Sequence, residues 1–263
     1  MKNRLLQLLA ENRRTFEPIQ NKIVAKDGAA AIYLYDPIVG DRLTAEWWGG
    51  ICPQDFVPAV RALDADQITL YTNCPGGDVF AAEAMSQALR EHRAKVTMQI
   101  EGYAASAATA IACACDEVVA TPASKYMIHQ TWTIAMGNAE HFEGVVALLR
   151  SCDSSMYDRY EKRTGQSREQ LEAWCKAETW FTAQDAVKHG FIDRVLETAT
   201  ASASAARSWN LSAYDHAPQP AAPAAAPAPA PTAPAANEGD FATQEHRDRQ
   251  QQRLQLLARL NRQ

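Results

Sequence analysis

The sequence predicts an α/β domain over residues 27–197, and three observations support this fold class. Short alternating or apolar segments recur along the stretch, and most are followed by a segment with helical periodicity. Glycine, proline and aspartate separate these segments, as is typical of the ends of strands and helices. The composition, 47 % hydrophobic and 22 % charged, is that of a globular protein with a sizeable core. Regular strand–helix alternation favours a largely parallel sheet.

Strands are predicted where apolar residues alternate or form short runs bounded by turns. They are 31–35, 67–72, 95–100, 117–120, 126–128 and 191–195, with a short extended piece at 178–181. Helices are predicted from three- and four-residue spacing and from capping residues. They are 53–63, 79–90, an alanine-rich helix that begins at Ser106, 138–164, 167–175 and 182–190. Trp47 and Trp48 precede two glycines and are predicted to lie in a loop, packed in the core or at an interface.

Three segments lie outside this domain. Residues 1–26 read as an N-terminal amphipathic segment without the long apolar core of a secretory signal. Residues 198–240 are rich in alanine, serine and proline, which predicts a disordered, extended linker. Residues 241–263 regain helical character with several arginines, and we expect a basic docking or scaffold-like helix that is too short to fold alone.

Charge and cysteine content exclude several classes of function. The net charge of −5 gives no indication of binding to nucleic acid or to an anionic membrane, and no apolar run is long enough to span a bilayer. The six cysteines form no CxxC pair, so we expect buried free thiols rather than a metal site or disulfides. We therefore expect a cytoplasmic protein that needs neither metal nor cofactor.

Ser106 stands where the strand 95–100 gives way to an alanine-rich helix. A serine at the first turn of a helix lies near the positive end of the helix dipole, and the next amide, that of Ala107, is free to bind an oxyanion. Serine is also a common helix N-cap, which is the simpler interpretation. Ser106 is nevertheless a candidate nucleophile.

Two other features point to the same edge of the sheet. Pro75-Gly76-Gly77 follows the strand 67–72, and His129 follows the strand 126–128. Because the carboxyl ends of parallel strands share one edge, these residues are expected near Ser106. The amides of Gly76 and Ala107 would then form an oxyanion hole, although Gly76 also suits a plain tight turn. His129 would be the general base, although a lone histidine is more often structural.

A general base of this kind requires an acid that orients its imidazole. Glu178 is the preferred candidate, because it precedes an apolar Trp180-Phe181 pair in a short extended segment where a carboxylate would be partly buried. The other acids considered are predicted to lie on solvated helix faces or away from the carboxyl edge. They are Asp116, Glu117, Asp153, Asp158, Asp185 and Asp193.

A set of motifs in one order resembles the proteolytic subunit (ClpP) family of Clp proteases, and in particular its phage branch, the head maturation proteases. The matching stretches are YTNCPGGD (71–78), GYAASA (102–107), YMIHQ (126–130), TGQS (164–167), ETWFTA (178–183) with Ala186, and GFID (190–193). Together they cover about residues 30–197.

The resemblance implies the ClpP/crotonase-like fold of repeated β-β-α units, with a long protruding oligomerisation helix at 138–164. It implies a serine endopeptidase with Ser106 as nucleophile, His129 as base and Glu178 as acid. Gly76 and Ala107 would supply the oxyanion hole, and Gly77 with Asp78 would line the peptide channel. A homo-oligomeric ring is expected, with phage capsid or scaffold proteins as substrates. Any ATP use would belong to a partner such as an AAA+ unfoldase, because the chain lacks a Walker motif.

Two departures from the family pattern leave alternatives open. Glutamate stands at position 178, where the housekeeping enzymes have aspartate, and the proline-rich linker with its basic tail is absent from them. The alternative functions are a general ATP-dependent Clp-type subunit that works with an unfoldase, and a catalytically silent scaffold or assembly protein. A crotonase-type acyl-CoA enzyme shares the general fold, but it would not need the serine and histidine pair.

Overall fold

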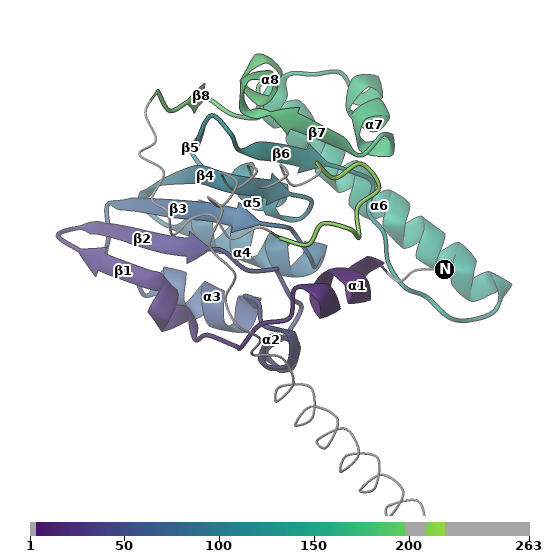
Figure 1. Cartoon of the computed structure of the whole chain (residues 1–263), viewed down its shortest axis with the longest axis horizontal. Helices are drawn as coiled ribbons and strands as arrows, with labels where there is room; N and C mark the ends of the chain where they lie inside the picture. Colours follow the sequence, from purple (N-terminus) through teal and green to yellow (C-terminus); the bar gives the residue numbers. More distant parts are fainter. Residues whose placement is uncertain (1–3, 198–208, 219–263) are drawn as a thin grey trace, which may run out of the picture. The chain divides into compact units, whose positions relative to one another are not determined.

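Within residues 4–197 and 209–218, the part of the chain that the computed structural model describes, eight strands form one mixed sheet (Figure 1). The main path runs β1-β2-β3-β4-β5-β8, while β6 branches from β4 and carries β7 at its outer edge. All pairs are parallel except β1 with β2 and β6 with β7. The strands are β1 (Ile23–Lys26), β2 (Ala29–Leu34), β3 (Gln67–Cys74), β4 (Lys95–Ala105), β5 (Glu117–Ala120), β6 (Lys125–Ile128), β7 (Thr179–Thr182) and β8 (Arg194–Val195).

Strand β4 organises this sheet, because it changes partner along its length. Its first half pairs with β5, with Ile100 opposite Ala120, and its second half pairs with β6, with Ala105 opposite Met127. The predicted strand 95–100 is therefore extended to Ala105, which places β6 and β7 beside the end of β4. This arrangement brings the ends of β3, β4 and β6 to one edge.

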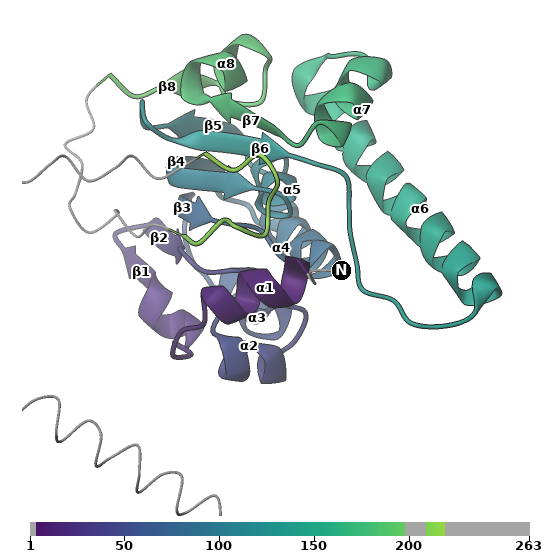
Figure 2. The same cartoon turned by 45° about the vertical axis from the view of Figure 1, so that its right-hand side comes forward.

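Helices cover the sheet and extend from it. In Figure 1, α3, α4 and α5 lie along one face, where Phe56, Met85 and Ile111 are buried. The long helix α6 projects away from the sheet and meets α7 at one end (Figure 2). The helices are α1 (Arg4–Glu11), a 3₁₀ turn η1 (Ile19–Lys22), α2 (Arg42–Trp48), α3 (Pro53–Arg61), α4 (Val79–Glu91), α5 (Ala108–Ala112), α6 (Ala139–Thr164), α7 (Arg168–Lys176) and α8 (Ala183–Lys188).

The predicted α/β class is confirmed, and the differences are local. The prediction of a loop at the paired tryptophans is wrong, because Trp47 and Trp48 end helix α2. Asp41 caps this helix by accepting a hydrogen bond from the amide of Thr44 at 2.7 Å. Gly49 ends it with φ of +77°, a conformation that favours glycine. Strand β1 was not predicted, because its side chains are mostly exposed and give no apolar alternation.

Three predictions concern the segments that precede and follow the α/β domain. Helix α1 lies in the expected amphipathic segment and buries Leu8 and Leu9. The prediction that residues 198–240 are disordered is wrong for residues 209–218, because Trp209 and Tyr214 in this segment are about as buried as core residues. The expected helix at 241–263 lies outside the described residues.

No helix in the described part of the chain combines the length and the apolar character needed to cross a membrane. The helix α6 would be long enough, but charged residues occur throughout it.

Candidate active site

Ser106 occupies the turn between β4 and α5 in an unusual backbone conformation. Its φ is +54°, which is uncommon for a residue other than glycine and is found preferentially where the surrounding structure enforces it. Its amide donates to the carbonyl of Met127 at 2.9 Å, and the buried Ala105 and Ala107 flank it. Helix α5 begins after Ala107 and not at Ser106. Ser106 is therefore held on a strained turn.

His129 follows β6 directly and contacts this serine. Its Nε2 lies 2.7 Å from the Oγ of Ser106. Burial lowers the pKa of His129 to about 3, and the positive charge of Arg4 contributes in the same direction. The imidazole is therefore neutral at neutral pH.

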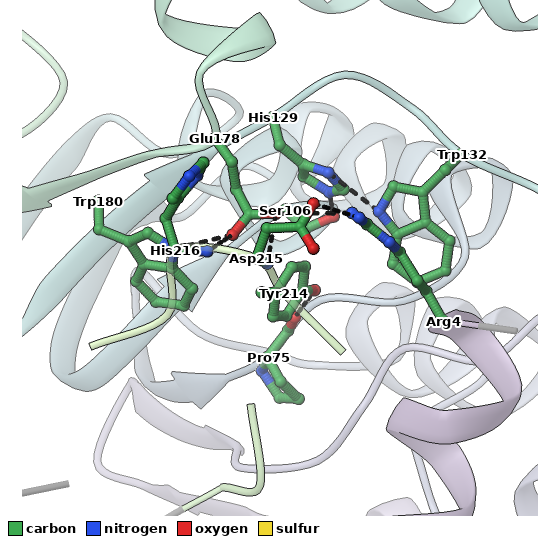
Figure 3. A network of polar contacts seen from close by, with 10 residues as sticks. All are labelled: Arg4, Pro75, Ser106, His129, Trp132, Glu178, Trp180, Tyr214, Asp215 and His216. Carbon is green, nitrogen blue, oxygen red and sulfur yellow. Dashed lines mark hydrogen bonds and ion pairs between the residues drawn. The ribbon is translucent and has the colours of Figure 1, made fainter. Parts of the chain in front are cut away.

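Trp132 occupies the other side of the imidazole, a contact that no sequence motif predicts. The indole Nε1 donates a hydrogen bond to Nδ1 of His129 at 3.0 Å (Figure 3). An indole N–H only donates, so Nδ1 must act as the acceptor and the proton of the neutral imidazole resides on Nε2. A general base needs its free lone pair on the nitrogen that faces the serine. This conformation therefore presents the wrong tautomer for removing the proton of Ser106.

Glu178 is close to this pair but is engaged elsewhere. It connects α7 to β7 with φ of +50°, and its side chain is buried. Its carboxylate accepts hydrogen bonds from the amides of Asp215 at 3.1 Å and His216 at 2.7 Å, and from the indole of Trp180 at 3.4 Å. Arg4 forms an ion pair with it at 3.7 Å. The carboxylate of Glu178 is thus bonded to the segment around Asp215 and not to His129, and its role as the acid stays a prediction (Figure 3).

The other acids considered have partners away from the imidazole. Asp153 accepts from the amide and hydroxyl of Thr131 and so anchors the loop that follows His129. The remaining carboxylates bond to backbone amides, a threonine hydroxyl or basic side chains near them. They are Asp116, Glu117, Asp158, Asp185 and Asp193.

The Gly76-Gly77 turn lies against Ser106, as predicted from the shared sheet edge. A Cβ on Gly76 would stand 2.7 Å from the Cβ of Ser106, and one on Gly77 would stand 1.9 Å from the carbonyl oxygen of Ile38. Only glycine fits at these positions. The amide of Gly76 donates to the Sγ of Cys74 at 3.4 Å, and its place in an oxyanion hole stays a prediction.

Asp78 caps helix α4 through a hydrogen bond from the amide of Ala81 at 2.7 Å. This structural role is sufficient to explain the aspartate, and its place in a peptide channel also stays a prediction.

A cavity of about 130 Å³ opens beside the serine. One wall of the cavity carries the reacting pair and its neighbours, namely Ser106, Ala107, His129 and Tyr214. Its other walls are mostly apolar and come from α4 and α6. They include Val79, Phe80, Leu149, Met156 and Tyr160. Such a cavity is suited to a side chain of an extended peptide.

The cysteines and histidines form no alternative centre in the described part of the chain. All six cysteines are free, and burial raises the pKa of Cys74 to about 12. No group of three or more histidine, cysteine, aspartate or glutamate side chains among the described residues is arranged to hold a metal ion.

Comparisons with known proteins agree on one family. A family model described as Clp protease matches residues 54–199. The ATP-dependent Clp protease proteolytic subunit 2 of Thermobifida fusca is 34 % identical over 143 residues, which are 54 % of this chain and 70 % of that protein. The proteolytic subunit of Deinococcus radiodurans is 30 % identical over 133 residues, or 50 % and 65 % of the two chains.

A solved structure, a ClpP1 mutant from Listeria monocytogenes, has the same fold. It matches with a TM-score of 0.54 at 20 % identity and covers 64 % of this chain and 91 % of that one. The family model extends over more than half of the chain and includes Ser106, His129 and Glu178. The chain therefore belongs to the Clp protease family.

Proposed function

We propose that the protein is a serine endopeptidase in which Ser106 is the nucleophile, His129 the general base and Glu178 the acid. The observation that carries this proposal is the 2.7 Å contact between Oγ of Ser106 and Nε2 of His129, made at a strained turn beside an apolar cavity. Membership of a family of serine peptidases supports it.

In the proposed reaction, Nε2 of His129 takes the proton of Ser106 as Oγ attacks the peptide carbonyl. The amides of Gly76 and Ala107 stabilise the oxyanion of the tetrahedral intermediate. His129 then protonates the leaving amine, and a water molecule, activated by the same imidazole, hydrolyses the acyl-enzyme and regenerates Ser106. This sequence requires the other imidazole tautomer, in which Nδ1–H donates a hydrogen bond to Glu178.

The decisive experiment is labelling with a fluorophosphonate probe, which reacts with an activated serine. The wild-type chain should be labelled at Ser106, as located by peptide mass spectrometry, and the Ser106→Ala variant should not. Complete absence of labelling in the assembled wild-type protein would favour the alternative of a catalytically silent assembly protein.

The finer part of the proposal is a role as a phage head maturation protease that cleaves capsid or scaffold proteins. It is supported by the sequence after residue 197, where a proline-rich stretch leads to a basic segment. A homo-oligomeric ring built through α6 also belongs to the proposal. Phe142, Val146 and Leu148 of α6 are exposed and would be covered by a neighbouring subunit.

A second candidate is a general proteolytic subunit that depends on an unfoldase, and the names of the relatives favour it. The two candidates differ in what they cleave. A head maturation protease should cut scaffold protein at defined sites without ATP. A general subunit should degrade a stably folded protein only with ATP and an AAA+ unfoldase, and digestion of both substrates by the purified protein distinguishes them.

A further inference from the structure

Residues 209–217 lie across the candidate active site, where Figure 3 shows Tyr214, Asp215 and His216, although 30 residues of sequence lie between Glu178 and Trp209. Trp209, Leu211 and Tyr214 are buried, with exposed fractions of 4 %, 6 % and 5 %. They form one apolar cluster with Leu8 of α1, with Ala105, which precedes Ser106, and with Met127 of β6, the strand that leads into His129. In Figures 1 and 2 this segment passes beside α1 and the ends of β3 and β6.

The segment is fixed to the turn that precedes the proposed oxyanion hole. The indole of Trp209 donates to the carbonyl of Asn73 at 2.8 Å, and the hydroxyl of Tyr214 donates to the carbonyl of Pro75 at 2.5 Å. Both acceptors belong to the stretch that leads from β3 into Gly76. An aromatic side chain is thereby held over the place where a substrate carbonyl must enter.

Tyr214 also contacts the reacting pair directly. Burial raises its pKa, and a hydrogen bond with Ser106 opposes this shift. Its ring lies 5.4 Å from the imidazole of His129 and 6.3 Å from the indole of Trp132, both edge to face. Trp132 therefore packs against Tyr214 in the position from which it donates to Nδ1.

The end of the segment binds the acid. The amides of Asp215 and His216 donate to the two carboxylate oxygens of Glu178, and Arg4 of α1 contacts both Glu178 and Asp215. Two backbone donors and a guanidinium satisfy much of the hydrogen-bonding capacity of the carboxylate. Glu178 is thus held away from the imidazole that it would orient.

These contacts affect the serine, the base and the acid at once. We propose that residues 209–217 are an intramolecular ligand of the active site, an inhibitory segment that must leave before a substrate peptide enters and the triad forms. This inference rests on the proposed function and extends it. The ligand that the site accepts is an aromatic peptide segment of this same chain, held with the help of α1.

The test compares rates of fluorophosphonate labelling in full-length variants. Trp209→Ala/Tyr214→Ala removes the two aromatic anchors of the inhibitory segment and should increase the rate of Ser106 labelling about tenfold or more, because the open state becomes more populated. Trp47→Ala and Tyr33→Ala remove exposed aromatic residues of the same types and should leave the rate unchanged. Ser106→Ala gives the background.

A second measurement shows whether the double variant is still folded. A synthetic peptide with the sequence of residues 209–217 is added to the double variant and should slow labelling again, whereas the same peptide with alanine in place of Tyr214 should not. This rescue requires a folded site.

The outcomes separate the two proposals. Equal labelling rates in the wild type and the double variant, or no slowing by the peptide, would overturn the inhibitory segment and leave the serine peptidase intact. No labelling of Ser106 in any variant would overturn the peptidase, and the inhibitory segment with it.

Discussion

The hydrogen bond from Trp132 to His129 predicts which tautomer the resting protein contains. A Trp132→Phe substitution keeps an aromatic ring beside Tyr214 but removes the only proton that the indole offers to Nδ1. We expect this change to shift the imidazole from the form protonated on Nε2 towards the form protonated on Nδ1. The second form is the one that accepts the proton of Ser106.

The size of the effect follows from the contact. A neutral, partly buried hydrogen bond of normal length, here 3.0 Å, contributes about 1 kcal/mol. A change of this size alters an equilibrium roughly fivefold. In the Trp209→Ala/Tyr214→Ala background, where the site is open to a probe, Trp132→Phe should therefore raise the rate of Ser106 labelling by at most this factor, because the loss of Tyr214 already removes part of the support of the indole. Because serine peptidases with a misplaced imidazole proton lose about 10⁴-fold in kcat, the tautomer strongly affects the rate.

The assay is ¹⁵N NMR of the imidazole, which distinguishes protonated from unprotonated ring nitrogens. The wild type should show an unprotonated Nδ1 and a protonated Nε2 in His129. Trp180→Phe is the matched control, because its indole donates to Glu178 and not to His129. A wild-type spectrum with a protonated Nδ1, or the same spectrum in Trp132→Phe and wild type, would refute the reasoning.

Two further predictions concern the backbone and the pH response. Gly77→Ala should lower the free energy of unfolding, measured in urea, by at least about 3 kcal/mol, because its Cβ would stand 1.9 Å from the carbonyl oxygen of Ile38 at φ of +140°. Gly144→Ala in α6 is the control: its Cβ would meet no atom within 4 Å, so this variant should be slightly more stable than the wild type. A milder loss than that of an ordinary core substitution would show that the turn can move. Arg4→Gln should raise the pKa of His129 in an NMR titration, yet leave it below 6.5, because burial is the larger cause. With a pKa of about 3 in the folded state, the histidine binds fewer protons folded than unfolded, so stability should fall as pH decreases from about 6.5 towards 3, and the fall should end at a higher pH and be smaller in total in Arg4→Gln. A pKa that stays the same in the variant would remove Arg4 as a cause.

Local sequence signals were sufficient for most of the fold and for the serine–histidine pair. Strand alternation placed Ser106, His129 and Gly76 at the carboxyl ends of three strands, and parallel pairing brings such ends together. The approach of Oγ to Nε2 follows from that topology. The sequence does not predict helix α2, because two tryptophans before two glycines are typical of a loop. Asp41, the N-cap of this helix, is the local feature that indicates its start.

The orientation of the base and the acid was not accessible from the sequence. Trp132 lies three residues after His129 in a stretch without periodicity, and nothing local indicates that its indole turns back to Nδ1. The composition around residues 209–217 predicts a linker, because one tryptophan, one leucine and one tyrosine form no periodic pattern among alanines and serines. Their burial depends on partners more than 100 residues away along the chain.

Glu178 connects these observations, because it has two competing sets of partners. In the described conformation its oxygens accept hydrogen bonds from the amides of Asp215 and His216, whereas catalysis requires that one oxygen accept a hydrogen bond from Nδ1–H of His129. The tautomer that would supply this proton is disfavoured while Trp132 donates to Nδ1, and Tyr214 packs against Trp132. Departure of residues 209–217 therefore frees the acid and removes the support of the indole in one step. Occupation of the site by a substrate peptide and formation of the triad are then coupled, since both require the same segment to leave.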